Sequence, residues 1–297
     1  MGEQDEATIT WLLASDEPAI RALARRDLLG EEVPPASGGP RVDRLLRHGT
    51  EGHPYRKWTG VHWRLISLAE LGVDPTLERV QELTDLVLTW LSGVSYPEGE
   101  GLPRRHASIE GNALAACCRL GRRDDPRADR LAGLLEGWQW PDGGWNCDQR
   151  ASGRRSSFHE TLGPMWGLHE FGRREPAERA AELLLEHRLF MSGDRVINKQ
   201  FTDLRFPPYW HYDILQALLI LSRMGLVSDP RAADALDVVE QKRRPDGRWA
   251  ANGYWWRATG DVSRELVDWW RGEPNDMITL NALRVLKASG RLRLISG

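Results

Sequence analysis

Apolar residues recur along this chain in segments that each finish on a glycine. One segment runs from Trp63 to Gly72, and four others have the same form, 112–121, 163–172, 216–225 and 281–290. Their apolar positions follow the period of a helix and not the strict alternation of a strand. Each glycine stands where a residue in the left-handed region commonly closes a helix. The pattern predicts repeated helices that end at these glycines.

After four of the glycines comes an acidic residue followed by proline, at Asp74-Pro75, Asp125-Pro126, Glu175-Pro176 and Asp229-Pro230. An acidic cap with proline at the first helical position is a typical helix start. The residues that follow are amphipathic, with charged faces suited to water. The pattern therefore predicts that each repeat consists of an inner apolar helix, a glycine turn and an outer amphipathic helix.

We predict an all-α fold, an α/α toroid of five to six helical hairpins with inner and outer helix layers. Residues 1–297 form one domain in this interpretation, with N-terminal helices and a loop in 1–54 and the repeated hairpins in 55–290. An open superhelix of the same hairpins is the alternative.

A tight turn occurs twice in the chain. The first copy is Gln139-Trp140-Pro141-Asp142-Gly143-Gly144-Trp145, and the second lies within 241–249, where Gln241 stands two residues further from the Asp-Gly pair. Proline fixes φ, aspartate bonds its own backbone and glycine accepts a positive φ, so Pro-Asp-Gly predicts a turn. The segment 97–102 stands where a third copy would fall but lacks the Trp.

The first turn matches the "QW" turn of squalene-hopene and oxidosqualene cyclases. With the hairpin repeat, the chain resembles the terpenoid cyclase and protein prenyltransferase superfamily over roughly Tyr55 to Gly290. It is similar to the small bacterial single-toroid members labelled cyclase-like or prenyltransferase-like. The resemblance implies the α/α toroid more firmly than it implies any one activity.

The chain departs from this superfamily in its chemical motifs. The Asp-x-Asp-Asp acid of the class II cyclases is absent, and so are the Asp-rich metal motifs of class I synthases. Protein prenyltransferases hold zinc with an Asp, a Cys just after it and a His one repeat later. Here the order is Cys147-Asp148, with His159 and His211 downstream. If zinc binds, these four residues are the expected ligands, but Cys147 could equally pack under Trp145.

The composition excludes several functional classes. A net charge of −3 with both signs spread along the chain argues against a nucleic-acid partner, which needs a clustered basic face. No apolar run approaches a membrane span, and the acidic start is unlike a secretory signal. Three cysteines suit a reducing compartment, so we expect a cytoplasmic protein. The sequence leaves the oligomeric state open.

Titratable residues gather at the start of the inner helices when the repeats are aligned on their glycines. The candidate catalytic residues are Glu110, His159, Glu160, His211, Asp213 and Asp276. In a closed ring they would meet at one mouth, where histidine and carboxylates can carry acid–base chemistry. The alternative is that these carboxylates only cap helices, since acidic residues belong in the first turn of any helix.

Aromatic residues accompany this group, above all in the segment 206–213, where two prolines precede four rings. They suit a cavity for an apolar or cationic species. The candidate substrate-binding residues are Trp58, Trp63, Asn112, Phe158, Tyr209, Trp210 and Tyr212. The alternative is that they fill the core between helices.

These observations lead to a first hypothesis, an enzyme that acts on an apolar small molecule by histidine and carboxylate chemistry as a cyclase, isomerase or lyase. No cofactor is required by this hypothesis, whereas zinc would be needed for prenyl transfer. A non-catalytic binding or scaffold toroid and a carbohydrate-active toroid are the alternatives. An open central cavity of several hundred cubic ångströms favours the enzyme, and a filled centre favours the scaffold.

Overall fold

The structure is a computed structural model that describes residues 2–96, 101–253, 269 and 273–292. Within these ranges the chain is mostly helical, so the predicted all-α class is confirmed. The helices are α1 (Glu3–Leu13), α2 (Pro18–Ala24), α3 (Pro40–Arg47), α4 (Val61–Glu70), α5 (Glu78–Ser92), α6 (Ala107–Cys117), α7 (Pro126–Trp138), α8 (Phe158–Phe171), α9 (Arg174–Glu186), α10 (Ile214–Arg223), α11 (Ala233–Gln241) and α13 (Asp276–Ala288). A two-stranded hairpin, β1 (Met191–Ser192) and β2 (Arg195–Val196), follows α9.

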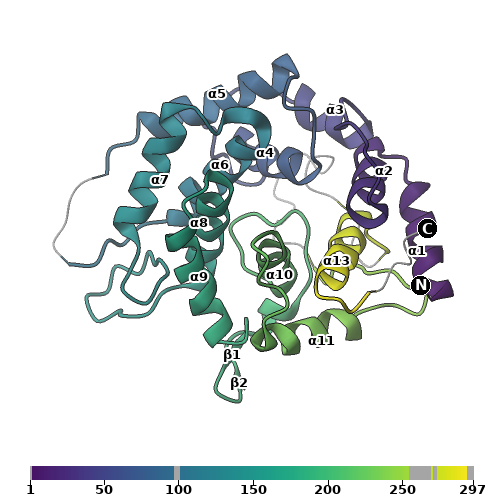
Figure 1. Cartoon of the computed structure of the whole chain (residues 1–297). Helices are drawn as coiled ribbons and strands as arrows, with labels where there is room; N and C mark the ends of the chain where they lie inside the picture. The colour runs from purple at the N-terminus through teal and green to yellow at the C-terminus, as the bar shows by residue number, and fades with distance from the viewer. Residues whose placement is uncertain (1, 97–100, 254–268, 270–272, 293–297) are drawn as a thin grey trace.

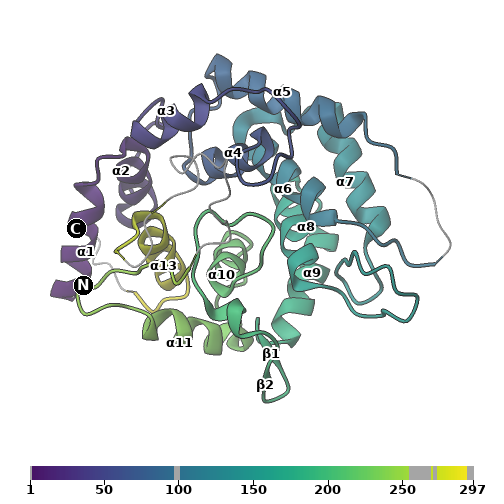
Figure 2. The same ribbon diagram turned by 180° about the vertical axis from the view of Figure 1, so that it is seen from behind.

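The helices lie in two layers. Figures 1 and 2 show α4, α6, α8, α10 and α13 toward the middle, with α5, α7, α9 and α11 outside them. Burial agrees with this placement, because every residue of α4 is buried whereas α9 is buried on one face only. The inner and outer helices of a repeat are thus separated as the apolar and amphipathic patterns indicate. Closure into a toroid and the domain boundaries stay predictions.

The glycines that end the inner helices adopt the conformation expected of them. The φ angles are 60° at Gly72, 85° at Gly121, 102° at Gly172, 76° at Gly225 and 75° at Gly290. Only glycine takes these angles without steric cost, which is why the repeat carries glycine at this point. This part of the sequence interpretation is confirmed at all five positions.

The acidic caps are confirmed at two of the four predicted starts. Asp125 accepts a hydrogen bond from the Arg127 amide at the start of α7, and Asp229 accepts one from Arg231. At the third, α5 begins at Glu78, after a turn, and not beside Asp74. At the fourth, α9 begins at Arg174, two residues before Pro176, so Glu175 lies within the helix and does not cap it.

Both Pro-Asp-Gly turns make the same contacts. The indole of Trp145 donates to the Leu135 carbonyl of the preceding helix, and that of Trp249 donates to the Val239 carbonyl. The amide of each Trp bonds to a threonine of the following inner helix, Thr161 in one case and Thr279 in the other. Each turn therefore ties an outer helix to the next inner helix, as the repeat predicts.

The expected register of the second turn is wrong. Gln139 donates to the Gly143 carbonyl, and in the second turn the same bond runs from Arg243 to the Gly247 carbonyl. Arg243, and not Gln241, therefore takes the place of Gln139, and the two turns have equal length. A long donor side chain is what the position needs, so an arginine serves there as well as a glutamine. The third candidate turn, 97–102, falls largely outside the described residues.

Candidate functional site

The residues of the candidate site are brought together by an unusually close contact between α6 and α8. Gly111 faces Gly163 and Pro164 of α8, and a Cβ placed on Gly111 would lie 2.2 Å from the Pro164 nitrogen. Gly167 of α8 is also packed closely, because a Cβ placed on it would lie 2.5 Å from the Gly111 carbonyl oxygen. Only glycine permits backbones to approach this far. The contact brings the first turns of α6 and α8 side by side.

At these first turns an imidazole meets a carboxylate. The Nδ1 atom of His106, the residue just before α6, lies 3.0 Å from Oε1 of Glu160 in α8. The second carboxylate oxygen of Glu160 accepts the Ser108 amide at 3.0 Å. A carboxylate can only accept, so the His106 Nδ1 carries the proton and its Nε2 is left for another partner. The His106 side chain is 69% exposed and the Glu160 side chain 5%.

The charges of this pair stabilise each other. Burial alone would raise the pKa of Glu160, but the hydrogen bonds from His106 and Ser108 outweigh it and hold that pKa below its ordinary value. The hydrogen bond to Glu160 raises the pKa of His106 above its ordinary value. This is how a carboxylate orients an imidazole and stabilises its charged form.

A second carboxyl group lies in the neighbouring turn of α6. Glu110 is buried and accepts a hydrogen bond from the Tyr96 hydroxyl at 2.7 Å. Burial, and to a smaller extent the charge of Glu160, raises the pKa of Glu110. Two carboxyl groups with pKa values moved in opposite directions thus sit at the start of one helix pair. Such separation is typical of acid–base sites.

Cys147 completes the cluster from the other side. Its thiol bonds to Glu160, and burial together with that carboxylate raises the pKa of Cys147 to about 12. A thiol held protonated in this way is a poor nucleophile, so the cluster does not resemble a cysteine–histidine catalytic pair.

The ligand atoms of His106, Cys147 and Glu160 all lie within 4.8 Å of one another. Thiolate, imidazole and carboxylate are zinc ligands, and three protein ligands leave a fourth position open. These residues therefore fit a metal ion by type and by proximity. The ligand set expected from sequence does not form: among the described residues, Asp148, His159 and His211 join no such group. Asp148 is bound instead to Arg150.

The two predicted histidines lie together in a different cluster. The ring centres of His159 and His211 are 5.8 Å apart, and Trp210 stacks on His211 at 3.8 Å. The Tyr212 amide donates to Nδ1 of His159, which places the proton of the neutral ring on Nε2. Burial lowers the pKa of both histidines, that of His211 to about 3. They are neutral at physiological pH, and His159 has no lone pair left to act as a base.

Asp213 and Asp276 bond to residues outside the cluster of His106, Cys147 and Glu160. Asp213 caps α10 by accepting the Gln216 amide at 3.1 Å, and burial raises its pKa to about 7. Asp276 begins α13 and contacts Ser15 at 3.4 Å, with Arg41 3.9 Å away. The cap of α13 itself is Asn275. Of the six candidate catalytic residues, the structure thus brings Glu110 and Glu160 into one group and His159 and His211 into another.

The candidate substrate-binding residues mostly pack against one another. Trp63, Phe158, Tyr209 and Tyr212 are buried, and their rings form edge-to-face pairs with neighbouring aromatics. Asn112 donates to the Tyr209 carbonyl at 3.4 Å. Trp58 and Trp210 are half-buried, and both rings stack with that of His211, with ring centres 6.3 Å and 3.8 Å from it. These contacts are those of a helix-packing core.

The space among the inner helices is small. A cavity lined by α8, α10 and α13 side chains, including Trp166 and Leu219, holds about 30 Å³. The ion pair between Arg223 of α10 and Glu70 of α4, 2.9 Å long, lies in its wall. This cavity has room for about one water molecule.

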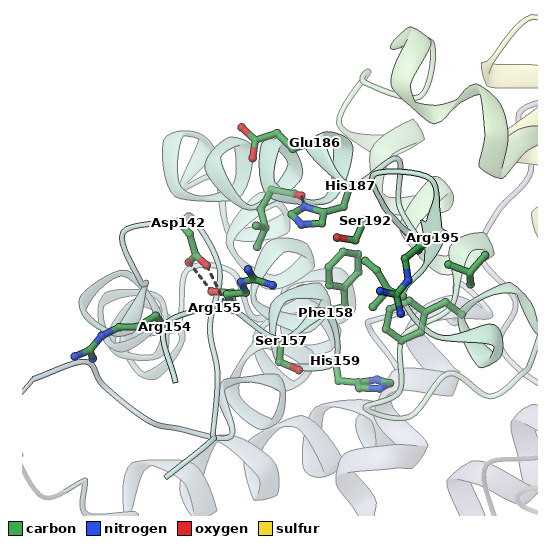
Figure 3. A pocket seen from close by; sticks show the side chains of 15 residues that line it. Asp142, Arg154, Arg155, Ser157, Phe158, His159, Glu186, His187, Ser192 and Arg195 are labelled. Atoms are coloured by element: carbon green, nitrogen blue, oxygen red, sulfur yellow. Dashed lines mark hydrogen bonds between the residues drawn. The ribbon is translucent and has the colours of Figure 1, made fainter. Parts of the chain in front are cut away.

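A larger pocket of about 730 Å³ opens at the start of α8, beside the end of α9 and the β-hairpin. Figure 3 shows Phe158 and His187 between Arg155 on one side and Arg195 on the other. The Nδ1 of His187 lies 3.0 Å from the Leu183 carbonyl, so the proton is on Nδ1 and Nε2 is an acceptor. His159 lies in the wall of this pocket, on the turn that carries Glu160.

Three residues of these sites were missed in the sequence. His106 stands one position before the level at which the repeats were compared, just ahead of Ala107. Tyr96 lies in a connection outside the helical pattern, and His187 follows α9 without a motif. Extending the comparison by one residue toward the N-terminus would have found His106. No pattern in the sequence marks the other two.

No family model matches the chain, and no curated protein matches it. Within the part of the chain that the structure describes, no helix is long and apolar enough to cross a membrane.

Proposed function

We propose that this chain is an enzyme similar to the terpenoid cyclases and prenyltransferases, which acts on an apolar small molecule by acid–base chemistry. The observation that carries the proposal is the hydrogen-bonded pair of His106 and Glu160. Glu160 fixes the imidazole with its proton on Nδ1 and presents Nε2 to solvent. In that tautomer Nε2 accepts a proton from a bound substrate, and the buried carboxylate stabilises the imidazolium that forms.

An apolar substrate is supported by the pocket in Figure 3. Phe158, Leu183 and Phe201 form an apolar part of its wall, and charged side chains such as Arg155 and Arg195 form another part. The pocket begins at the turn of α8 that carries Glu160, but neither Glu160 nor His106 is among the residues that line it. At about 730 Å³ it has the size of a small-molecule site, whereas the cavity lined by Trp166 and Leu219 does not. The substrate would therefore lie at the start of α8 and not within the ring.

Zinc-dependent chemistry is the second candidate, because His106, Cys147 and Glu160 form a suitable donor set. A bound zinc ion would act as a Lewis acid or activate a coordinated thiol or water. Metal analysis of purified protein decides this point. Stoichiometric zinc that is lost in Cys147→Ser and kept in Cys118→Ser supports it, since among the described residues Cys118 belongs to no such group. Absence of metal from the wild type contradicts it.

The small size of the cavity lined by Trp166 and Leu219 favours a non-catalytic scaffold over the carbohydrate-active enzyme that is the other remaining alternative. A screen with polyprenyl diphosphates, polyenes and oligosaccharides separates the two, by thermal shift for binding and mass spectrometry for products. We expect His106→Gln to lower turnover of a substrate about 100-fold or more, as expected for loss of a general base. The exposed imidazole makes a small contribution to stability, so the melting temperature should barely change.

His48→Gln is the matched control, because His48 is also exposed and its imidazole forms no hydrogen bond, ion pair or ring contact with the described residues. It should behave as the wild type. Conversion of no compound in the panel, or full activity of His106→Gln, would contradict the proposal.

A further inference from the structure

A second pocket lies at the opposite ends of the inner helices. It holds about 480 Å³ between the ends of α10 and α13, the residues after α6 and the π-helical turn Arg25–Leu29 that follows α2. Figures 1 and 2 both show α10 and α13 side by side there. The charged side chains in its wall are Arg26, Asp27, Arg119, Arg223, Arg284 and Lys287.

Positive charge exceeds negative charge in this pocket. Asp27 bonds to both Arg26 and Arg284, Glu70 bonds to Arg223, and Glu170 bonds to Arg119. Five cations thus share three carboxylates, which leaves two positive charges unbalanced among the described residues. Burial, together with the positive charge of the neighbouring Arg223, lowers the pKa of Arg284 to about 10.

Donors also exceed acceptors. A guanidinium offers five N–H donors, but within the described part of the chain Arg223 donates one side-chain hydrogen bond, from Nη2 to Glu70. The Nε of Arg284 is buried without a partner in the described part of the chain. Lys287 donates to the carbonyls of Asp27 and Leu28, which leaves one ammonium proton. Several charged donors therefore converge on one hollow without enough acceptors.

Helix ends alone do not account for this arrangement. The partial negative charge at a helix C-terminus attracts cations, which explains one arginine or lysine per helix. It does not explain four arginines and a lysine in the wall of one cavity, with one guanidinium nitrogen buried and unsatisfied by the residues that the structure describes. An arginine fork matches the oxygens of phosphate and carboxylate groups in pairs.

We propose that this pocket binds a small oxyanion with at least two negative charges, a phosphate compound or a polycarboxylate. The anion would supply the missing acceptors to Arg223, Arg284 and Lys287 and balance their charge. Since these residues come from the opposite ends of the helices from His106, the site is independent of the proposed active site.

Calorimetric titration with pyrophosphate, and separately with citrate, at constant ionic strength tests the proposal. We expect saturable binding to the wild type and an affinity about tenfold lower in Arg26→Ala, which removes one charged donor. The matched control is Arg25→Ala, since Arg25 is the preceding residue, is also exposed and lies outside the pocket wall. Preference for pyrophosphate or for citrate identifies the phosphate or the carboxylate class.

Ser222→Asp provides a second and opposite test. Ser222 lies in the wall of the pocket, so an aspartate there supplies the missing negative charge. Without added anion it should raise the melting temperature by about 2 °C over Ser222→Asn, which has the same shape without the charge. It should also abolish anion binding. No saturable binding to the wild type, or equal binding by Arg26→Ala, Ser222→Asp and the wild type, would overturn the proposal.

Discussion

The two ends of the inner helices use carboxylates in different ways. At the start of α6 and α8, Glu160 faces an exposed imidazole and Glu110 faces a tyrosine hydroxyl. At the far ends, Glu70 and Glu170 are bound to Arg223 and Arg119. A carboxylate is favoured at a helix N-terminus and disfavoured at a C-terminus. The helix dipole therefore stabilises the charges of Glu110 and Glu160. Glu70 and Glu170 have no such help and are stabilised by their arginine partners.

The difference separates a group that can react from a group that holds the helices together. His106 is mostly exposed, so its protonation can change at small cost to the fold. Glu70 and Arg223 are enclosed between α4 and α10, so neither can lose its partner without leaving a buried charge. Substitutions at the two ends should accordingly affect activity at one end and stability at the other.

The largest expected effect is at the C-terminal end. Arg223→Met leaves the buried Glu70 carboxylate without its partner and should lower the free energy of unfolding by about 3–5 kcal/mol. Urea denaturation followed by circular dichroism measures it. Arg173→Met is the control, because it breaks an exposed pair with Asp129 and should cost less than about 1 kcal/mol. An equally small loss of unfolding free energy in Arg223→Met and Arg173→Met would mean that the buried pair contributes no more to stability than the exposed pair.

Asp213 gives a pH-dependent test at the N-terminal end. Its pKa rises from 3.8 to about 7 on folding, so its contribution to stability is fully present below pH 3.8 and is lost as the pH rises through 7. The difference corresponds to about 4 kcal/mol. Denaturation at pH values from 4 to 8 should show this loss in the wild type.

Asp213→Asn keeps a residue that caps helices well and removes the ionisation. Its unfolding free energy should change less between pH 5 and 8 than that of the wild type. The same pH dependence in both proteins would assign the loss to other groups.

A smaller effect is expected where α6 meets α8. Gly111→Ala places a methyl group against the backbone of Gly163 and Pro164, which should destabilise the fold by about 1–3 kcal/mol and displace Glu160 from His106. Gly133→Ala in α7 is the control, since nothing lies within 4 Å of its added Cβ. That change should stabilise the protein by about 0.5–1 kcal/mol. A neutral Gly111→Ala would show that the close contact does not position the site.

Local rules of the backbone made much of the fold predictable. Gly72, Gly121, Gly172, Gly225 and Gly290 all have positive φ, and the Trp of each Pro-Asp-Gly turn bonds to the helix before it. These features depend on neighbours in the sequence. The register of the second turn was misread because the pattern was sought as glutamine, whereas the position requires only a long donor, which Arg243 provides.

The site was harder to predict because its partners come from separate repeats. Glu110 and Glu160 were found by aligning the repeats, but their partners His106 and Tyr96 lie outside the helices that were compared. His159 and Glu160 are adjacent in sequence, yet they belong to different clusters. Which neighbour a side chain faces is set by packing, which the sequence pattern does not contain.

The same alignment also carries information about the opposite end. The residues two positions before the first four glycines alternate in charge, and they are Glu70, Arg119, Glu170 and Arg223. In the structure Glu70 pairs with Arg223, and Arg119 pairs with Glu170. This alternation can be read from the sequence once the helix ends are compared as carefully as the helix starts. The convergence of Arg284 and Lys287 with Arg223 follows only from the packing of α13 against α10.

The protonation state of His106 is the most direct test of the proposed active site. Nitrogen NMR of the imidazole, in metal-free protein, reports which ring nitrogen carries the proton and the pKa of the ring. The account predicts the Nδ1–H form and a pKa above the ordinary 6.5 that falls in Glu160→Gln. A ring protonated on Nε2, or a pKa that Glu160→Gln leaves unchanged, would contradict the pairing on which the proposed function rests.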